Sequence, residues 1–367
     1  MAANIIKRTF GNGPTHVLYD WDILDDATAE KVCGELGITL HVFDIQRVLP
    51  HLERNFLGFV TPDLLERSQK KAEVKNYRDD LLETVRAVGA SHVHVCSYLL
   101  PRSTLDEIRA LCATVSTRVT DDPERSKWYS EPYVKNFDRA ICSGVMFDHA
   151  TTIEDAWRRW GAKNVARIPT YPNPRHYDDS PIDYGAKDID VVFVGAANIP
   201  RMRRLAALKA GLGDALKLYG NYGNGDWRSI KGIAYKLLNF GFKIGHVENL
   251  SAEGLKSVYR RAKIGINLHI TDYMGPSNVR SYELPLNGVM QLADNPAGYP
   301  ALYDVGKEVV CFENVAQAVE LARHYLARDE ERVAIAKAGH ARARKDYTYE
   351  NILRQTLAYA VFGRKHA

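Results

Sequence analysis

The sequence predicts an α/β fold with two Rossmann-like, doubly wound domains, and three observations lead to this prediction. Short apolar runs alternate with amphipathic segments along the chain, which is typical of parallel sheets covered by helices. The length of 367 residues exceeds what one hydrophobic core usually supports. A polar, proline-rich segment at residues 171–181 separates two halves of similar size. We therefore expect two domains facing each other across a cleft, with C-terminal helices packing back.

The individual elements follow from local patterns. Apolar runs predict strands in the first half at residues 16–19, 39–43, 92–96, 115–119, 140–142 and 165–168. Further strands are predicted in the second half at residues 190–194, 216–219, 243–247, 264–268, 289–292 and 308–312. Apolar residues at three- and four-residue spacing predict helices at 315–327, 330–344 and 349–362.

The domain boundaries are placed between these elements. We expect an N-terminal acceptor-side domain at 1–175, a linker at 176–187 and a C-terminal domain at 188–345. The helix at 346–367 is expected to cross back to the first domain. Ligands of doubly wound sheets bind at the carboxyl ends of the strands, so the chemistry should lie there.

Composition indicates a soluble, cytoplasmic protein. No apolar run is long enough to cross a bilayer, and no charged leader with a cleavable apolar stretch is apparent. The five cysteines are scattered, odd in number and never in a C-x-x-C pair, which predicts buried thiols instead of disulfides or a zinc site.

Charge is distributed unevenly around a net value of +4. Residues 1–186 contain 23 Lys and Arg against 27 Asp and Glu, whereas residues 187–367 contain 26 against 18. The basic second half fits a domain that holds an anionic donor, and an unevenly charged solvated surface is the plain alternative.

The most informative run lies at residues 275–294. It is expected to form a short helix at 277–287 between two buried strands. The free amides of a helix start and the guanidinium of Arg280 suit phosphate, and Glu283 can accept hydrogen bonds from ribose hydroxyls. The residues Asn278, Val279, Arg280 and Glu283 therefore predict a site for a nucleoside-diphosphate sugar. A surface salt bridge is the alternative for Glu283.

Further motifs occur in a fixed order around this run. They are Phe193-Val194-Gly195, Pro200-Arg201, Tyr219-Gly220 with Trp227, Tyr259 with residues 264–269, residues 278–283, Gly288 and residues 306–310. As a set, over residues 190–350, they resemble the spore-maturation (CgeB-like) glycosyltransferases, which have the GT-B fold. The resemblance implies metal-independent transfer of a hexose or pentose from a nucleotide sugar, UDP-sugar first, with no other cofactor.

The resemblance also implies roles for single residues. Gly195 would let the backbone approach the donor pyrophosphate, and Arg201 would neutralise that group. Tyr219 and Gly220 would lie near the nucleobase. Apart from the resemblance, the position of His269 at the end of a donor-domain strand suits contact with the sugar or a phosphate, and a satisfied strand-end histidine is the alternative. Arg203 and Arg204 could share the phosphate role of Arg201, but their spacing on a helix predicts that one of them is a solvated charge.

One position departs from a better-known GT-B pattern. Many retaining enzymes have a Glu seven residues before a second Glu, and here Gly275 occupies the position of the first. That Glu contacts the transferred sugar in those enzymes, so the sugar and the stereochemical outcome stay open.

Candidates for the general base lie in the first half. Asp22 follows the first predicted strand, where an inverting enzyme would take the proton of the attacking hydroxyl, and Asp20 is close by. Asp122 and His149 follow later strands and are alternatives. A helix cap and first-turn acid beside Asp25 and Asp26 would also explain the Asp20-Trp21-Asp22 run.

Two interpretations of the acceptor's identity are considered. A glycan or another cell-surface or spore-type hydroxyl follows from the resemblance. A hydroxymethylated base in DNA is the alternative, because residues 67–78 and 219–243 mix basic with aromatic side chains. A nucleotide-sugar epimerase and a non-catalytic nucleotide-binding protein are further alternatives, since fold alone does not fix function.

Overall fold

The computed structural model describes most of the chain. The described residues are 6–20, 23–44, 71–95, 102–112, 114–119, 131, 133–148, 150–196, 199–220, 237, 241, 247–269, 278–294 and 297–364. The chain forms two compact units, one made of Met1–Thr170 with Tyr349–Ala367 and the other of Tyr171–Thr348. Residues 176–187, expected as the linker, belong to the second unit in this division.

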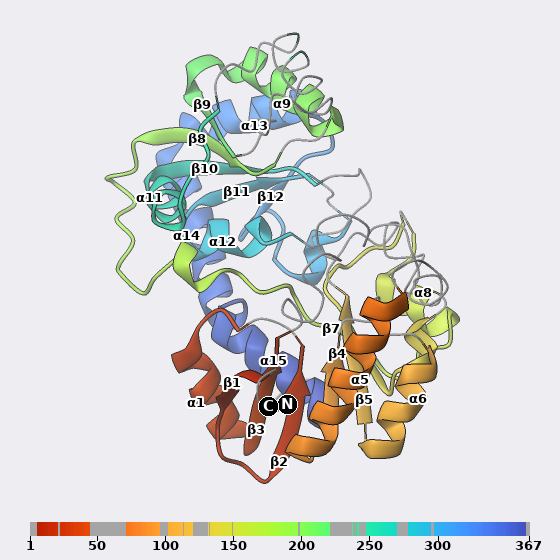
Figure 1. Ribbon diagram of the computed structural model, residues 1–367. Helices are drawn as coiled ribbons and strands as arrows, with labels where there is room; N and C mark the ends of the chain where they lie inside the picture. Colours follow the sequence, from red (N-terminus) through yellow and green to blue (C-terminus); the bar gives the residue numbers. More distant parts are fainter. Residues whose placement is uncertain are drawn as a thin grey trace. The chain divides into compact units, whose positions relative to one another are not determined.

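The first unit is built on a seven-stranded sheet with the order β1-β3-β2-β4-β5-β6-β7 (Figure 1). Its strands are β1 (Ile6–Phe10), β2 (Thr15–Tyr19), β3 (Ile38–Phe43), β4 (His92–Val95), β5 (Thr114–Val119), β6 (Arg139–Cys142) and β7 (Val165–Arg167). All neighbours pair in parallel except β1, which is antiparallel to β3. The edge strand β1 was not predicted from the sequence, because its alternation of half-buried and exposed residues gives no apolar run.

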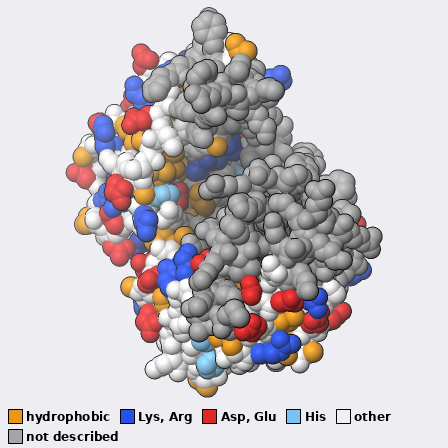
Figure 2. All heavy atoms as spheres, in the orientation of Figure 1, with side chains coloured by type: hydrophobic (Ala, Val, Ile, Leu, Met, Phe, Trp, Pro, Cys, Tyr) orange, Lys and Arg blue, Asp and Glu red, His pale blue; other side chains and the backbone are white. Residues whose placement is uncertain are grey.

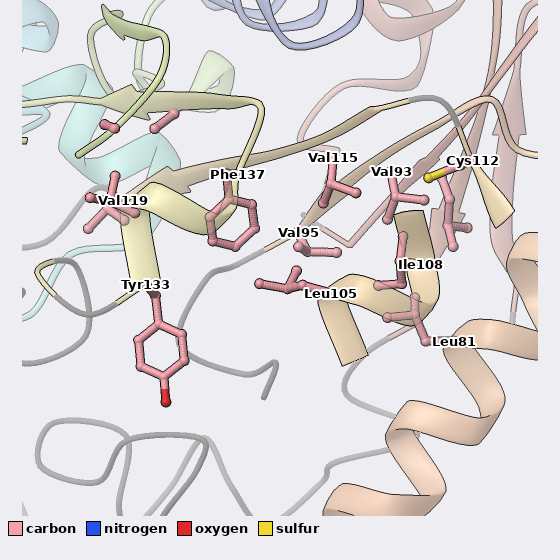
Figure 3. Close-up of a cluster of buried hydrophobic side chains, with 14 of the residues drawn as sticks. Leu81, Val93, Val95, Leu105, Ile108, Cys112, Val115, Val119, Tyr133 and Phe137 are labelled. Carbon is pink, nitrogen blue, oxygen red and sulfur yellow. The ribbon is translucent and has the colours of Figure 1, made fainter. Parts of the chain in front are cut away.

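Helices α1 (Asp26–Leu36), α5 (Lys71–Val88), α6 (Arg102–Leu111) and α8 (Ile153–Arg159) connect these strands. One face of the sheet packs against α5 and α6 in an apolar cluster. Its members include Leu81, Val93, Val95, Leu105, Ile108, Cys112, Val115, Val119, Tyr133 and Phe137 (Figure 3). A buried thiol, as at Cys112, agrees with the expectation for the cysteines, and burial raises its pKa to about 11.

Polar side chains project from the same strands toward the other face of this sheet. His92 Nδ1 lies 2.5 Å from Thr114 Oγ1, and its Nε2 lies 2.8 Å from Ser116 Oγ. His94 Nδ1 lies 2.7 Å from the same hydroxyl. Burial, followed by the charge of Arg139, lowers the pKa of His92 to about 3. The first unit therefore contains a buried row of uncharged histidines.

The last helix, α15 (Tyr349–Phe362), packs in the first unit against α1, β5 and β6. The hydroxyl oxygen of Tyr349 accepts a hydrogen bond from Leu24 N, in the loop before α1, at 3.0 Å. The buried guanidinium of Arg118 donates to Thr356 Oγ1 at 2.6 Å. Polar contacts thus attach α15 at its start and in its middle.

The second unit is built on a five-stranded parallel sheet with the order β12-β11-β10-β8-β9. Its strands are β8 (Ile189–Val194), β9 (Leu216–Tyr219), β10 (Ala262–Asn267), β11 (Met290–Ala293) and β12 (Val310–Cys311). Its helices are α9 (Ile199–Leu212), α11 (Ala252–Arg261), α12 (Arg280–Leu286), α13 (Val315–Leu326) and α14 (Asp329–Asp346). The structure therefore has two parallel-sheet Rossmann-like units.

Strand positions predicted from apolar runs agree with the observed ones within two residues at each end, and the run at 308–312 corresponds to a strand of only two residues, Val310–Cys311. The predicted strand 243–247 lies largely outside the described residues. Within the described parts of the chain, no helix combines the length and the apolarity that a membrane span requires. Figure 2 shows acidic and basic side chains interspersed on the face that it draws.

Candidate active site

The candidate site lies at the carboxyl ends of the second sheet. Strands β8, β9, β10 and β11 run parallel, so the residues that follow them meet at one edge. Gly195 follows β8, Gly220 follows β9, and His269 and Asp294 come after β10 and β11. Of these four residues, Gly195, Gly220 and His269 were expected from the sequence to lie in the donor site.

Two glycines allow the strand ends to approach closely. Gly195 donates its N–H to Tyr219 O at 3.0 Å, and Gly220 donates to Glu248 O at 2.8 Å. A Cβ on Gly220, whose φ is +125°, would lie 2.3 Å from Gly195 O. A Cβ on Gly195 would lie 2.2 Å from Arg280 Nη1. Gly220 therefore requires glycine because a Cβ would clash with backbone, whereas a Cβ at Gly195 would displace the guanidinium of Arg280.

Arg280, at the first position of α12, reaches under these strand ends. Its Nη1 donates to Val194 O at 2.9 Å, its Nη2 to Leu268 O at 3.0 Å and its Nε to Asn267 Oδ1 at 3.1 Å. The guanidinium lies 5.1 Å from the ring centre of Phe193. The side chain is buried, with 8% of the residue exposed.

The charge of Arg280 has no anionic partner in the part of the chain that the structure describes. Its recorded acceptors are two backbone carbonyls and one amide oxygen, all uncharged. A guanidinium has five N–H groups, so three hydrogen bonds leave two donors for a ligand. Buried charges are normally paired. The sequence did not reveal that Arg280 also ties β8 to β10.

Two arginines of α9 lie beside Arg280. Arg201 donates through Nη2 to Leu268 O at 3.0 Å and lies over the ring of Phe193. Arg204 donates from Nη1 to Asp294 Oδ2 at 2.9 Å and from Nη2 to His269 O. Arg203 is exposed, so it is the solvated member of the pair considered from the sequence.

Asn267, near the end of β10, organises the floor of the site and was not singled out in the sequence. Its Oδ1 accepts from Arg280 Nε and from Asn278 Nδ2, the latter at 2.9 Å. Its Nδ2 donates to Tyr299 OH at 2.9 Å and to Ser281 Oγ at 3.1 Å. The signal in the sequence was a single Asn inside an apolar run, and the structure shows that this residue is fully buried.

The start of α12 is capped by Asn278. Its Oδ1 accepts from Ser281 N at 3.2 Å, which satisfies one of the free amides of the helix start. Val279 is 37% exposed. The helix spans Arg280–Leu286 and is therefore shorter than the predicted range 277–287.

Glu283 is buried, with 2% of the residue exposed, and is not part of a surface salt bridge. Its Oε1 accepts from Asn173 N at 3.1 Å and from His176 Nδ1 at 2.8 Å. The hydrogen bonds recorded among described residues leave Oε2 without a protein donor. Glu283 thus fixes the segment before β8 and keeps one carboxylate oxygen for another group.

His269 is held by a buried carboxylate. Asp294 accepts the His269 backbone N–H with Oδ2 at 2.8 Å and lies with Oδ1 2.5 Å from Nδ1 of the ring. Burial alone raises the pKa of Asp294, but the charges of His269 and Arg204 and the hydrogen bonds of His269 outweigh it and lower the pKa below 3.8. Asp294 is therefore an ionised acceptor.

The proposed general bases are not described by the structure: Asp22, Asp122 and His149 lie outside the described residues. Asp20 is buried at the end of β2, where its backbone N donates to His94 O at 3.2 Å. The cap of α1 is Asp25, whose Oδ2 accepts from Thr28 N at 2.8 Å. No cluster of three or more metal-ligating side chains occurs among the described residues.

Comparison with solved structures defines the fold class. Sucrose-phosphate synthase from Thermosynechococcus elongatus has a TM-score of 0.63 at 13% identity, over 95% of this chain and 98% of that chain. HepE from Anabaena, solved in complex with UDP and glucose, has a TM-score of 0.62 at 12% identity, over 95% and 100%. A Listeria monocytogenes protein assigned as a UDP-N-acetylglucosamine 2-epimerase has a TM-score of 0.55 at 11% identity, over 94% and 95%. The fold of this chain is the GT-B fold.

The sequence comparison is consistent with that class. Residues 201–358 match the family described as glycosyl transferase-like. No curated protein sequence is significantly similar to the chain. The family match and the fold together identify a glycosyltransferase of the GT-B type.

Proposed function

We propose that the protein transfers a sugar from a nucleoside-diphosphate sugar to an acceptor hydroxyl without a metal ion, and that the favoured donor is a UDP-sugar. The observation that supports this most directly is the buried guanidinium of Arg280, which lacks a carboxylate partner among the described residues. A diphosphate would supply the missing negative charge through the two remaining N–H donors. HepE, a structure with the same fold, was solved with UDP and glucose.

The other donor contacts follow from the same geometry. The backbone at Gly195 and Gly220 would approach the diphosphate and the nucleobase, with Tyr219 beside the base. Arg201 and the start of α12 at Asn278 and Val279 would add donors for phosphate. The second oxygen of Glu283 would accept from a ribose hydroxyl.

The chemical step requires little from the protein on the donor side. A nucleoside diphosphate is already a good leaving group, so arginines that stabilise its developing charge are sufficient. We propose Asp22 as the general base that takes the proton of the acceptor hydroxyl, with Asp122 and His149 as alternatives. Replacing Asp22 by Asn should abolish turnover and leave UDP affinity unchanged. Retained turnover would move the base to Asp122 or His149.

The acceptor is proposed to be a glycan or another cell-surface or spore-type hydroxyl. The DNA alternative rests on residues 67–78 and 219–243, many of which lie outside the described residues. An epimerase would change the nucleotide sugar in the absence of acceptor, and a binding protein would release no UDP. Product analysis with and without acceptor separates these outcomes.

The donor assignment is tested by calorimetric titration of UDP, GDP and ADP. Arg280→Gln removes the buried charge, and Arg203→Gln is a matched control because Arg203 is exposed on α9. We expect the Arg280 variant to lose at least tenfold in affinity for the preferred nucleotide, since a hydrogen bond to a charged group contributes about 1.5–3 kcal/mol. Equal affinity in both variants would refute the role of Arg280.

A further inference from the structure

A second cavity lies at the amino edge of the second sheet, opposite the candidate active site. Its lining comes from the segment before β8, from the start of β10 and from the first half of α14. The charged residues of the lining are Lys187, Lys263, Arg332, Lys337, Asp329 and Glu330. The volume of about 690 Å³ falls within the range of about 300–1,000 Å³ that is typical of small-molecule pockets. The cavity is therefore large enough for an organic ligand.

Lys187 is the buried cation of this cavity. The residue is 6% exposed, and its Nζ donates to Arg260 O at 2.8 Å and to Asn287 O at 3.3 Å. These carbonyls lie at the carboxyl ends of α11 and α12. An ammonium group has three N–H donors, so one donor remains. No carboxylate pairs with Lys187 among the described residues, although buried charges are normally paired.

Most cations around Lys187 already have carboxylate partners. The pairs are Arg260 with Asp178, Lys263 with Asp190 and Arg332 with Asp329. His340 of α14 is a further neighbour, and its Nδ1 donates to Pro285 O at 2.9 Å. Glu330 forms no ion pair within the described chain, but it is exposed at the start of α14. The described surroundings of Lys187 therefore contain no buried carboxylate that is left to neutralise its charge.

Lys337 supplies a second ammonium group that has no carboxylate partner in the described part of the chain. Its Nζ lies 5.5 Å from the ring centre of Tyr184, and the Nζ of Lys187 lies 6.0 Å from the same centre. Lys337 is exposed, so its side chain can turn toward an anion that Lys187 binds. Two ammonium groups therefore border the same part of the cavity.

The charge of Lys187 is unfavourable as long as no anion is bound. Burial, followed by the charges of Arg260 and Arg332, lowers the pKa of Lys187 to about 7. A bound anion acts in the opposite direction, because a negative charge within about 4–6 Å favours the protonated form. Lys187 is therefore suited to take up a proton together with an anion.

We propose that this cavity binds a phosphate group, held by the ammonium groups of Lys187 and Lys337 beside the ring of Tyr184. A phosphate monoester has a charge of about −1.5 to −2 at pH 7, which two ammonium groups match better than they match a carboxylate. The cavity has room for a phosphorylated small molecule as well as for free phosphate. The site is separate from the proposed donor site, and the inference does not depend on the proposed function.

The titration of Lys187 itself provides the first test. Carbon-13 NMR of the full-length protein with labelled lysine follows each Cε signal with pH, and Lys187→Arg identifies the signal of this residue. Lys187 should titrate near pH 7 without added anion. Glucose 6-phosphate or inorganic phosphate, added in excess, should raise its pKa to about 8 or higher. A pKa that neither probe raises would refute the proposal, since a lysine that only caps two helices would not respond.

Calorimetric titration of glucose 6-phosphate provides a second test, which requires no change at a buried residue. Lys337→Gln should weaken binding by about fivefold, because an exposed ion pair makes a modest contribution. Lys345→Gln is the matched control, since Lys345 is exposed on the same helix and lies outside the cavity lining. Equal affinity in the two variants would overturn the assignment of the phosphate to Lys337.

Two further comparisons exclude the donor site and identify the ligand. Arg280→Gln should bind glucose 6-phosphate as the wild type does, and a loss in this variant would assign the anion to the donor site and refute the proposal. Tighter binding of glucose 6-phosphate than of inorganic phosphate would support the site with a phosphorylated small molecule as its ligand. Equal affinity for both would support the site with free phosphate as its ligand.

Discussion

The unpaired charge of Arg280 leads to a sharp prediction for Asn267→Asp. Asn267 Oδ1 accepts from Arg280 Nε at 3.1 Å, so the new carboxylate would form an internal ion pair with the guanidinium. The site tolerates the lost amide hydrogens, because Tyr299 OH and Ser281 Oγ can turn and donate. Gln291 Nε2, buried and without a partner among the described residues, can rotate to donate as well.

The expected effect on ligand binding is large. The added carboxylate and a bound diphosphate would contact the same guanidinium, and two unit charges about 6 Å apart repel by about 3 kcal/mol at an effective dielectric constant of about 20. UDP affinity should therefore fall by about 100-fold. The free energy of unfolding should change little, because pairing with the buried cation offsets the cost of burying the new carboxylate.

Calorimetry for UDP affinity and urea denaturation for the free energy of unfolding measure the two effects. Asn314→Asp is the matched control, since Asn314 caps α13 through a bond to Gln317 N at 3.0 Å and Asp caps equally well. The control adds the same charge at a helix cap outside the candidate site. Unchanged UDP affinity in Asn267→Asp would refute the inference that the unpaired charge of Arg280 binds an anionic ligand.

Two further predictions concern Glu283 and the histidines of the first unit. Glu283→Ala should lower the free energy of unfolding by about 3 kcal/mol, because Asn173 N and His176 Nδ1 lose their acceptor. Glu283→Gln should keep both hydrogen bonds and lose mainly nucleotide affinity. Urea denaturation measures the first effect, and calorimetry measures the second. Equal stability of the two variants would contradict this role. The pKa of His92 is about 3 in the folded protein and 6.5 in the unfolded chain, so between these pH values the unfolded chain binds one more proton. The contribution of His92 to the free energy of unfolding is therefore constant above pH 6.5 and falls below it, by about 2 kcal/mol at pH 5. Denaturation curves at pH 7 and pH 5 measure this loss, and His92→Gln should reduce it; a loss that persists unchanged would assign it to other groups.

The sequence by itself determined the architecture and the position of the donor motif. Buried strands such as β8 and β10 are runs of apolar residues, and such a run can be recognised within one short segment of the sequence. The alternation of such runs with helices specifies parallel sheets in both units. The ordered motifs around Arg280 and Glu283 indicated a nucleotide-sugar enzyme for the same reason, because residue type and spacing can be read along one segment.

The tertiary structure alone decided what each polar side chain contacts. Glu283 meets His176, 107 residues earlier in the chain, and His269 meets Asp294 across two strands. Arg280 was expected to face a phosphate directly, yet three of its bonds hold strand ends and Asn267 together. Hydrogen-bond partners are set by the packing of distant segments, which leaves no periodic signal in the sequence. The edge strand β1, whose pairing depends on β3, was missed for the same reason.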